Sequence, residues 1–382
     1  MQSNNRNSSG QTLAVLHPAF ALTGVLHAIG GPLLPSLAST FHLKDSQSGL
    51  LFLFYFAGTS LGAFFCRTNY ARSMALGFLA MAACCLGVAV ANLAFLPPLF
   101  LLLGISVGVP MSGVSLFAGR NFGSRCAPLL TFLNFSWSIG ALAAPLLAAQ
   151  VLLHHSYRAA YIVLAAASAV AALACWFLIQ DAPEIARATT GAQAFPNLKL
   201  IIVFAIAAFL EVGVENTAAA WLSTYALRMA RDGVVLAAAS SSFYWVGFLS
   251  SRGLSSLVLL RTDPIRVFRV AVTVALLAAV LLAALPSIAG RNAAMFLLGA
   301  ALAPIFPLVI AGFFARARHT SDSRWVLATA GFGGSVLPWL AGWISTHSGS
   351  LRVGILIIPA AMLLMIFVLP AMSEARPLVA AE

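Results

Sequence analysis

The sequence of 382 residues has few charged side chains, only 8% of the total, and only ten residues are acidic. A soluble domain averages about 25% charged residues. With 61% hydrophobic residues and a mean hydropathy of +0.97, the chain is too apolar for the surface of a soluble protein. Apolar runs of roughly 20 residues, the length that crosses a bilayer as a helix, recur from end to end. The composition therefore predicts an integral membrane protein with many spans.

Cysteine is also scarce, and the sequence lacks the motifs of common enzymes. Its five cysteines show no metal-ligand spacing. There is no His-x-x-x-His pair and no phosphate-binding glycine loop. We therefore expect no enzymatic activity, no metal site and no cofactor.

The net charge of +11 follows the predicted topology. If the N-terminus is cytoplasmic, 15 of the 21 Lys and Arg residues fall on or near that side. The six exceptions are Lys44, Arg158, Arg228, Arg231, Arg291 and Arg352. This asymmetry is the one that the positive-inside rule describes. We expect an inner (plasma) membrane of a bacterium with both chain termini in the cytoplasm, and no nucleic-acid partner.

Twelve spans are predicted, at 14–38, 48–66, 73–93, 96–118, 127–152, 158–179, 199–225, 234–258, 267–288, 292–314, 324–345 and 352–372. The expected domains are a disordered tail (1–13), a six-helix half (14–180), a cytoplasmic linker (181–197), a second six-helix half (198–372) and a C-terminal tail (373–382).

Weak internal echoes indicate that the two halves are a duplication. "LASTF" (37–41) returns as "WLSTY" (221–225), and "LLLG" (101–104) returns as "FLLG" (296–299). "SIGALAAP" (138–145) corresponds to "FGGSVLPWLAG" (332–342). Two pseudo-symmetric six-helix halves, related by an axis along the membrane normal, form the major facilitator fold, which holds its substrate between the halves near the midplane.

"GPLLPSLASTFHLKDSQSGLLFLFYFAGTSLGAFF" (31–65) and "EVGVENTAAAWLSTY" (211–225) resemble segments of the fucose/galactose/glucose–proton symporters of the major facilitator superfamily. "FLSSRGL", "APIFPLVIAGFF" and "GFGGSVLPWLAGW" continue the resemblance in spans 8, 10 and 11. The resemblance implies a secondary active transporter, a monomer in the bilayer that carries a sugar, usually a hexose, with a proton by alternating access. Sodium remains open as the coupling ion.

The sequence departs from that family at three places. Cys66 stands in "GAFFCRTNYAR" (62–72) where the superfamily motif has an acid. The resemblance implies an aspartate in span 1 and a glutamate in span 4, but those positions hold Gly31 and, approximately, Met111. Since the first six spans contain no acidic residue, any coupling carboxylate must come from span 7.

Span 7 contains two glutamates one helical turn apart, Glu211 and Glu215. Spacing i, i+4 puts them on one face of the helix. A carboxylate at the centre of a span costs about 2.5–3.5 kcal/mol on insertion scales, so this face requires a water-filled cavity, a cation or a proton. We assign Glu215 to substrate binding with a part in coupling, and Glu211 to the proton site. The alternative is that both are structural glutamates.

Further polar and aromatic side chains within the spans complete the predicted substrate site. His27 corresponds to Glu211 by the duplication and could bind substrate or share a proton. Aromatic faces and amides suit sugars. These candidates are Asn216, Asn134, Trp137, Tyr244, Trp245 and Phe306. Simple packing, or for His27 a hydrogen bond to a backbone carbonyl, is the alternative.

Arg252, near the cytoplasmic end of span 8, matches the Gly-Arg position of the resembling family, and we interpret it as a gate or structural cation. A drug or other organic-solute/proton antiporter on the same fold is the main alternative function, because embedded acids and aromatics also bind organic cations. A lipid carrier or a sensor without transport is a further possibility.

Overall fold

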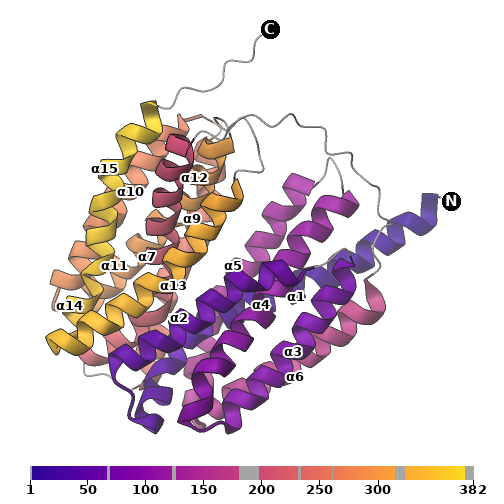
Figure 1. Cartoon of the computed structure of the whole chain (residues 1–382), viewed down its shortest axis with the longest axis horizontal. Coiled ribbons are helices and arrows are strands. Elements are labelled where there is room, and N and C mark those ends of the chain that lie inside the picture. Colours follow the sequence, from indigo (N-terminus) through magenta and orange to yellow (C-terminus); the bar gives the residue numbers. More distant parts are fainter. Residues whose placement is uncertain are drawn as a thin grey trace.

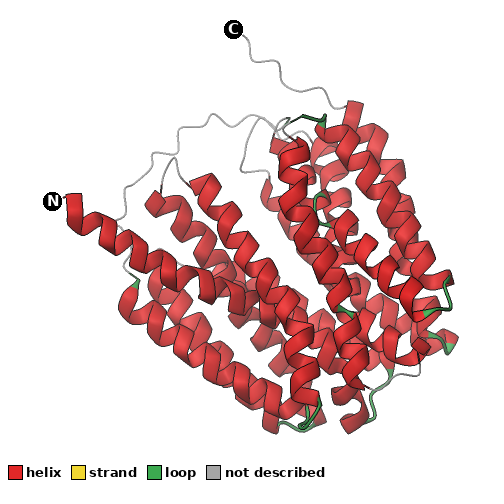
Figure 2. Cartoon of the chain, turned by 180° about the vertical axis from the view of Figure 1, so that it is seen from behind, coloured by secondary structure: helices red, strands yellow, loops and turns green. Residues whose placement is uncertain are grey.

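The computed structural model describes residues 2–66, 69–122, 126–179, 198–230, 234–259, 261–314, 316 and 323–374, and all regular elements in these ranges are helical (Figure 2). The helices are α1 (Gln2–Phe41), α2 (Asp45–Gly62), α3 (Tyr70–Val90), α4 (Leu96–Phe122), α5 (Cys126–Leu152), α6 (Tyr157–Leu178), α7 (Leu198–Ala230), α8 (Val234–Ser240), α9 (Ser242–Leu259), α10 (Pro264–Ala284), α11 (Ile288–Leu302), α12 (Ile305–Phe314), α13 (Ser323–Ser348), α14 (Leu351–Ile355) and α15 (Ile357–Glu374). The predicted linker, 181–197, lies outside the described residues.

Ten stretches of these helices are long and apolar enough to cross a bilayer. They include Ile288–Phe314, which α11 and α12 form together, and Leu351–Pro370, which α14 and α15 form. The remaining two positions of the predicted twelve are taken by α7, which has 33 residues, and by α8 with α9. The chain is therefore an all-α membrane protein with twelve spans.

Three spans contain a break that the sequence pattern did not predict. Proline removes a backbone donor, which accounts for the breaks before α12, at Pro304, and before α15, near Pro359. Between α8 and α9, the hydroxyls of Ser240 and Ser241 donate to the carbonyls of Leu236 and Ala238. Such local bonds compete with the helical pattern of the backbone.

The start of the chain differs from the expected disordered tail, because α1 begins at Gln2 and residues 2–13 belong to it. No proline precedes Pro18, and Pro18 itself lies inside the helix. This polar segment therefore lacks the proline that would interrupt the backbone hydrogen bonds, and those of the first span continue outward. At the other end of the chain, α15 ends at Glu374, and residues 375–382 lie outside the described part.

The same pairs of spans pack together in each half of the molecule (Figure 1). In the first half α1 packs against α5, α2 against α4, and α3 against both α6 and α4. In the second half α7 packs against α13, α9 against α11, and α10 against both α15 and α11. These are the corresponding spans of a six-helix unit. The duplication that the sequence echoes indicated is therefore confirmed as two pseudo-symmetric halves.

One echo corresponds to a pair of close backbone contacts. Gly104, the last residue of "LLLG", lies against the carbonyl of Tyr55 in α2. Gly299, the last residue of "FLLG", lies against the carbonyl of Tyr244 in α9. A β-carbon at either glycine would collide with that carbonyl oxygen. Each half thus uses glycine to bring its second and fourth spans into backbone contact.

The halves meet closely at one end of the molecule. In Figure 1 the ribbons of the two halves lie together where α2 and α13 cross, and they diverge toward the end that carries the labelled chain termini. At the closed end Arg228 donates two hydrogen bonds, of 2.6 and 2.5 Å, to the carboxylate of Asp45. The hydroxyl of Ser345 donates to the same carboxylate at 2.5 Å. We call these three side chains the Asp45 latch, because they join α2 of one half to α7 and α13 of the other.

Candidate functional site

The two glutamates of α7 lie in the interior of the protein on one side of that helix. The helix continues through them from Leu198 to Ala230 without a break. The side chain of Glu211 is fully buried, whereas Glu215, one turn further on, is half-buried. The shared face predicted from the i, i+4 spacing is therefore present, with Glu211 deeper in the protein than Glu215.

Side chains from both halves line a cavity of about 280 Å³ between them. Seven of the predicted site residues line it: His27, Asn134, Trp137, Glu215, Asn216, Arg252 and Phe306. They come from α1 and α5 in the first half and from α7, α9 and α12 in the second. The structure thus brings together residues that are far apart in the sequence and belong to both halves, as a central site between the halves requires.

The other three predicted residues lie outside the cavity lining. Glu211 and Tyr244 are fully buried, and they interact electrostatically with each other and with Arg252. Trp245 packs edge-on against Trp137, with ring centroids 6.1 Å apart. These side chains form a layer next to the cavity rather than part of its wall.

Several buried polar atoms around the cavity have no hydrogen-bond partner in the described structure. They are both carboxylate oxygens of Glu211, both ring nitrogens of His27, the indole nitrogen of Trp137, the hydroxyl of Tyr244 and Nε of Arg252. Glu215 lies close to Glu211, and the amide of Asn216 lies close to His27, but without the geometry of a formed hydrogen bond. Buried polar groups in native proteins rarely remain unpaired, so this concentration indicates a site for a polar ligand or water.

The guanidinium of Arg252 occupies the wall of the cavity. Its Nη1 donates to the hydroxyl of Ser138 at 3.1 Å. The guanidinium carbon lies 4.6 Å from the ring centroid of Phe248 and 5.6 Å from that of Trp137. Both glutamates of α7 are close enough to interact with it electrostatically. Arg252 therefore faces the two carboxylates. The sequence predicted a gate or structural cation near the membrane surface and did not place Arg252 beside the glutamates.

The sequence interpretation missed two hydroxyl groups of the cavity, on Thr59 and Ser60. Both already donate to the carbonyl of Phe56 in their own helix, so their oxygens are left as acceptors toward the cavity. The signal was available, because "GTS" (58–60) interrupts an apolar run. Met111 also lines the cavity. The first half therefore presents an apolar side chain at the place where the resemblance implies a glutamate.

Gly31 has no room for the aspartate that the resemblance implies at its position. A β-carbon there would collide with the carbonyl oxygen of Ala219 in α7. Glycine lets the backbones of α1 and α7 approach closely at this point. An acid at this position would force the two central helices apart, so within the described residues the carboxylates of the site come from the second half.

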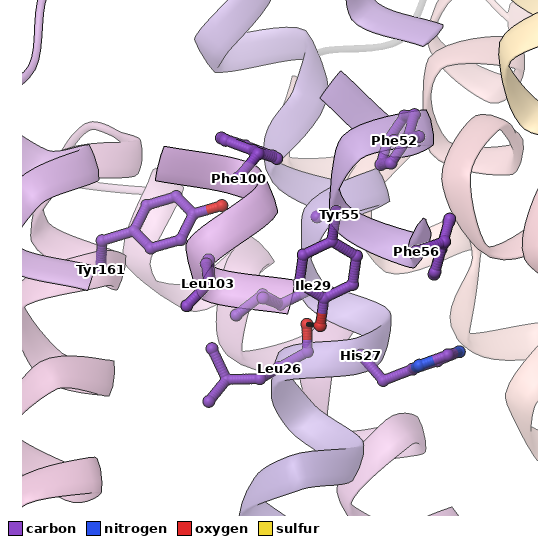
Figure 3. Close-up of a pocket in the computed structure, with 10 residues that line it drawn as sticks. Leu26, His27, Ile29, Phe52, Tyr55, Phe56, Phe100, Leu103 and Tyr161 are labelled. Carbon is purple, nitrogen blue, oxygen red and sulfur yellow. Dashed lines mark hydrogen bonds between the residues drawn. The ribbon is translucent and has the colours of Figure 1, made fainter. Parts of the chain in front are cut away.

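A much smaller pocket lies inside the first half, beside the main cavity (Figure 3). Its volume is about 10 Å³, room for roughly one water molecule. Tyr55 closes it by donating a hydrogen bond of 2.9 Å to the carbonyl of Leu26. In Figure 3 the imidazole of His27 points away from Tyr55, toward the side on which Phe56 lies. His27 therefore presents its ring to the main cavity, and the small pocket has no room for a substrate.

The chain belongs to the Major Facilitator Superfamily, whose family model matches residues 16–322. It is 24% identical over 347 residues to the glucose/mannose transporter GlcP of Bacillus subtilis (strain 168), an alignment that covers 85% of each chain. The chain is therefore a transporter rather than an enzyme.

Solved structures of transporters share its fold. The nucleoside transporter NupG aligns with a TM-score of 0.74 at 15% identity, covering 97% of this chain and 100% of that one. A variant of the E. coli fucose:proton symporter FucP aligns with a TM-score of 0.60 at 16% identity, covering 94% of this chain and 98% of that one.

Proposed function

We propose that this protein takes up a sugar, most simply a hexose, together with a proton, and that both bind at the central cavity. The observation that carries the proposal is the group of unpaired buried polar atoms around this cavity. A sugar carries many hydroxyl groups, each of which both donates and accepts a hydrogen bond. Such a ligand can pair with carboxylate, imidazole, indole and guanidinium groups at once.

The size and composition of the cavity support a small polar solute. Its volume of about 280 Å³ lies just below the roughly 300–1,000 Å³ typical of sites for drug-sized ligands. Trp137 supplies a flat apolar face, and Asn134 and Asn216 supply amides. In this arrangement Glu215 accepts hydrogen bonds from sugar hydroxyls. The similarity to a glucose/mannose transporter adds weight to a hexose.

The balance of charge supports coupling to a cation. Within the described residues, two carboxylates, those of Glu211 and Glu215, face one guanidinium, that of Arg252. When both acids are ionised, one negative charge remains uncompensated in a low-dielectric site, which is costly. A neutral sugar cannot compensate it, but a bound proton can. We assign the proton to Glu211, the deeper carboxylate, with His27 as a second carrier, and sodium is the alternative coupling ion.

Alternating access requires that the two ends of the cavity open in turn. The Asp45 latch holds one end closed, while the ribbons of the two halves diverge at the end that carries the termini (Figure 1). In the proposal this second end faces the cytoplasm of a bacterial cell across its inner membrane. The halves 14–180 and 198–372 are the moving bodies, and the linker 181–197 joins them on the cytoplasmic side.

A thermal-shift screen of the purified protein with hexoses, pentoses, nucleosides and cationic drugs tests the substrate. A ligand at 100 times its dissociation constant stabilises the protein by about 2.7 kcal/mol. We expect a hexose to raise the unfolding temperature of the wild type and of Asp263→Asn, whose carboxylate caps α10 away from the cavity lining. The same hexose should not stabilise Glu215→Ala. Stabilisation by organic cations alone would instead identify an antiporter for such solutes. The two carboxylates beside one guanidinium would also bind a cationic solute.

A further inference from the structure

A second cavity, of about 370 Å³, lies on the outer surface of the second half, away from the central site. It exists because α9 and α10 both pack against α11 but barely contact each other. Their facing sides therefore form the walls of a groove, and α11 forms its floor. Ala300 and Ala301 on the floor and Ala271 on one wall are small, which keeps the groove open.

The walls of the groove are apolar and face the bilayer. Leu254 and Val258 on α9, Val270 on α10 and Leu297 on α11 are all exposed side chains of its lining. In a spanning segment, exposed apolar side chains of this kind contact lipid chains rather than water. The groove is therefore filled by hydrocarbon when the protein is in a membrane.

Arginines surround one mouth of the groove. Arg266 lines it directly, and Arg261 and Arg269 are exposed nearby on the same short stretch of chain. The only acid in this stretch, Asp263, is engaged as the N-cap of α10, where it accepts from the backbone of Ile265 at 3.1 Å. The mouth therefore carries a local excess of positive charge, which complements an anionic headgroup.

The length of the groove matches one leaflet of a bilayer. From Arg266 to Val274 the lining of α10 advances by eight residue steps, or about 12 Å at 1.5 Å per residue. Half of the roughly 30 Å hydrocarbon core is about 15 Å. A phospholipid whose phosphate meets Arg266 thus has an acyl chain that extends along the groove to about the midplane.

We infer that this groove is a specific site for an anionic phospholipid of the leaflet at the end of the bundle that carries the chain termini. One acyl chain lies between α9 and α10, and the phosphate and anionic headgroup lie against Arg266 and its neighbouring arginines. The lipid bridges the second and third spans of the half that contributes both α7 glutamates. The inference does not depend on which solute the central cavity carries.

Native mass spectrometry of the full-length protein, purified in detergent and supplemented with equal amounts of phosphatidylglycerol and phosphatidylcholine, tests the site. We expect the wild type to retain phosphatidylglycerol over phosphatidylcholine. Because a basic residue near the membrane surface contributes about 1 kcal/mol to binding of anionic lipid, Arg266→Gln should reduce this retention about fivefold. Arg72→Gln, an exposed arginine at the same end of the other half, is the matched control and should not change it.

A second variant tests the groove itself rather than its charge. Ala300→Phe places a ring on the floor and should displace the acyl chain, lowering retention of both lipids while the unfolding temperature in detergent stays within a few degrees of the wild type. Equal retention of the two lipids by the wild type, or equal loss in Arg266→Gln and Arg72→Gln, would overturn the inference. So would unchanged retention in a folded Ala300→Phe, or a dimer of the chain that Ala300→Phe abolishes.

Discussion

Replacing Asp45 with asparagine should loosen the closed end of the transporter. The carboxylate of Asp45 accepts two hydrogen bonds from Arg228 and one from the hydroxyl of Ser345. These bonds join the two halves, so the end cannot open while they persist. Asparagine keeps the size of the side chain but removes its charge and one acceptor oxygen.

The expected effect lies between those of a buried and a surface ion pair. Hydrogen bonds to charged groups contribute about 1.5–3 kcal/mol each, whereas exposed pairs contribute about 0–1 kcal/mol. The side chain of Asp45 is 10% exposed, but that of Arg228 is 42% exposed. When the charge of Asp45 is removed, water can therefore replace many of the hydrogen bonds that Arg228 made to the carboxylate. We expect the closed state to lose about 1–2 kcal/mol, which raises the ratio of open to closed molecules about 5–30-fold.

Electron–electron double resonance between spin labels on either side of this end measures that ratio. Thr40 on α1 and His347 on α13 are exposed residues of the two halves, and cysteines there can carry the labels once the native cysteines have been replaced. The long-distance population should grow in Asp45→Asn but not in Asp263→Asn, a cap at the opposite end. An unchanged distance distribution in Asp45→Asn would refute the role of the latch.

Three other variants test individual contacts. Glu211→Gln should lose uptake driven by a pH gradient while keeping sugar counterflow in liposomes, and concentrative uptake equal to wild type would move the proton to another group. Trp221→Phe loses an indole hydrogen bond of 2.8 Å to a carbonyl of α13, so unfolding free energy should fall by about 0.5–1.5 kcal/mol, unlike Trp343→Phe on the exposed side of that helix. Gly104→Leu should prevent accumulation of folded protein, as judged by size-exclusion chromatography, whereas Gly253→Ala, with nothing within 4 Å of the new methyl group, should not.

The positions of the twelve spans could be predicted because hydropathy is a local property. Each predicted span coincides with a helix or a pair of consecutive helices in the described residues. The shared face of Glu211 and Glu215 was equally predictable, since the helical period fixes it without any partner. The duplication was visible in "LLLG" and "FLLG", because the same glycine contact is needed in each half.

The hydropathy pattern of the sequence was least informative where a helix is interrupted or extended. It treated the segment before the first span as disordered, although α1 begins at Gln2. It did not separate α8 from α9, because the serine hydroxyls that bond to nearby carbonyls there are equally compatible with a continuous helix. Composition over a long window cannot detect changes that depend on one or two residues.

The sequence by itself determined the class of protein, its spans and the face that carries the two glutamates. Only the tertiary structure decided that Arg252 faces those glutamates, that His27 lies beside Asn216, and that Asp45 joins Arg228. Arg252 and the glutamates meet within the second half, where α9 lies near α7, whereas the other two pairs meet only where the two halves pack together. Hydropathy and helical periodicity fix each helix separately, whereas the pairing of polar groups depends on how the helices, and then the two halves, rotate and dock against one another.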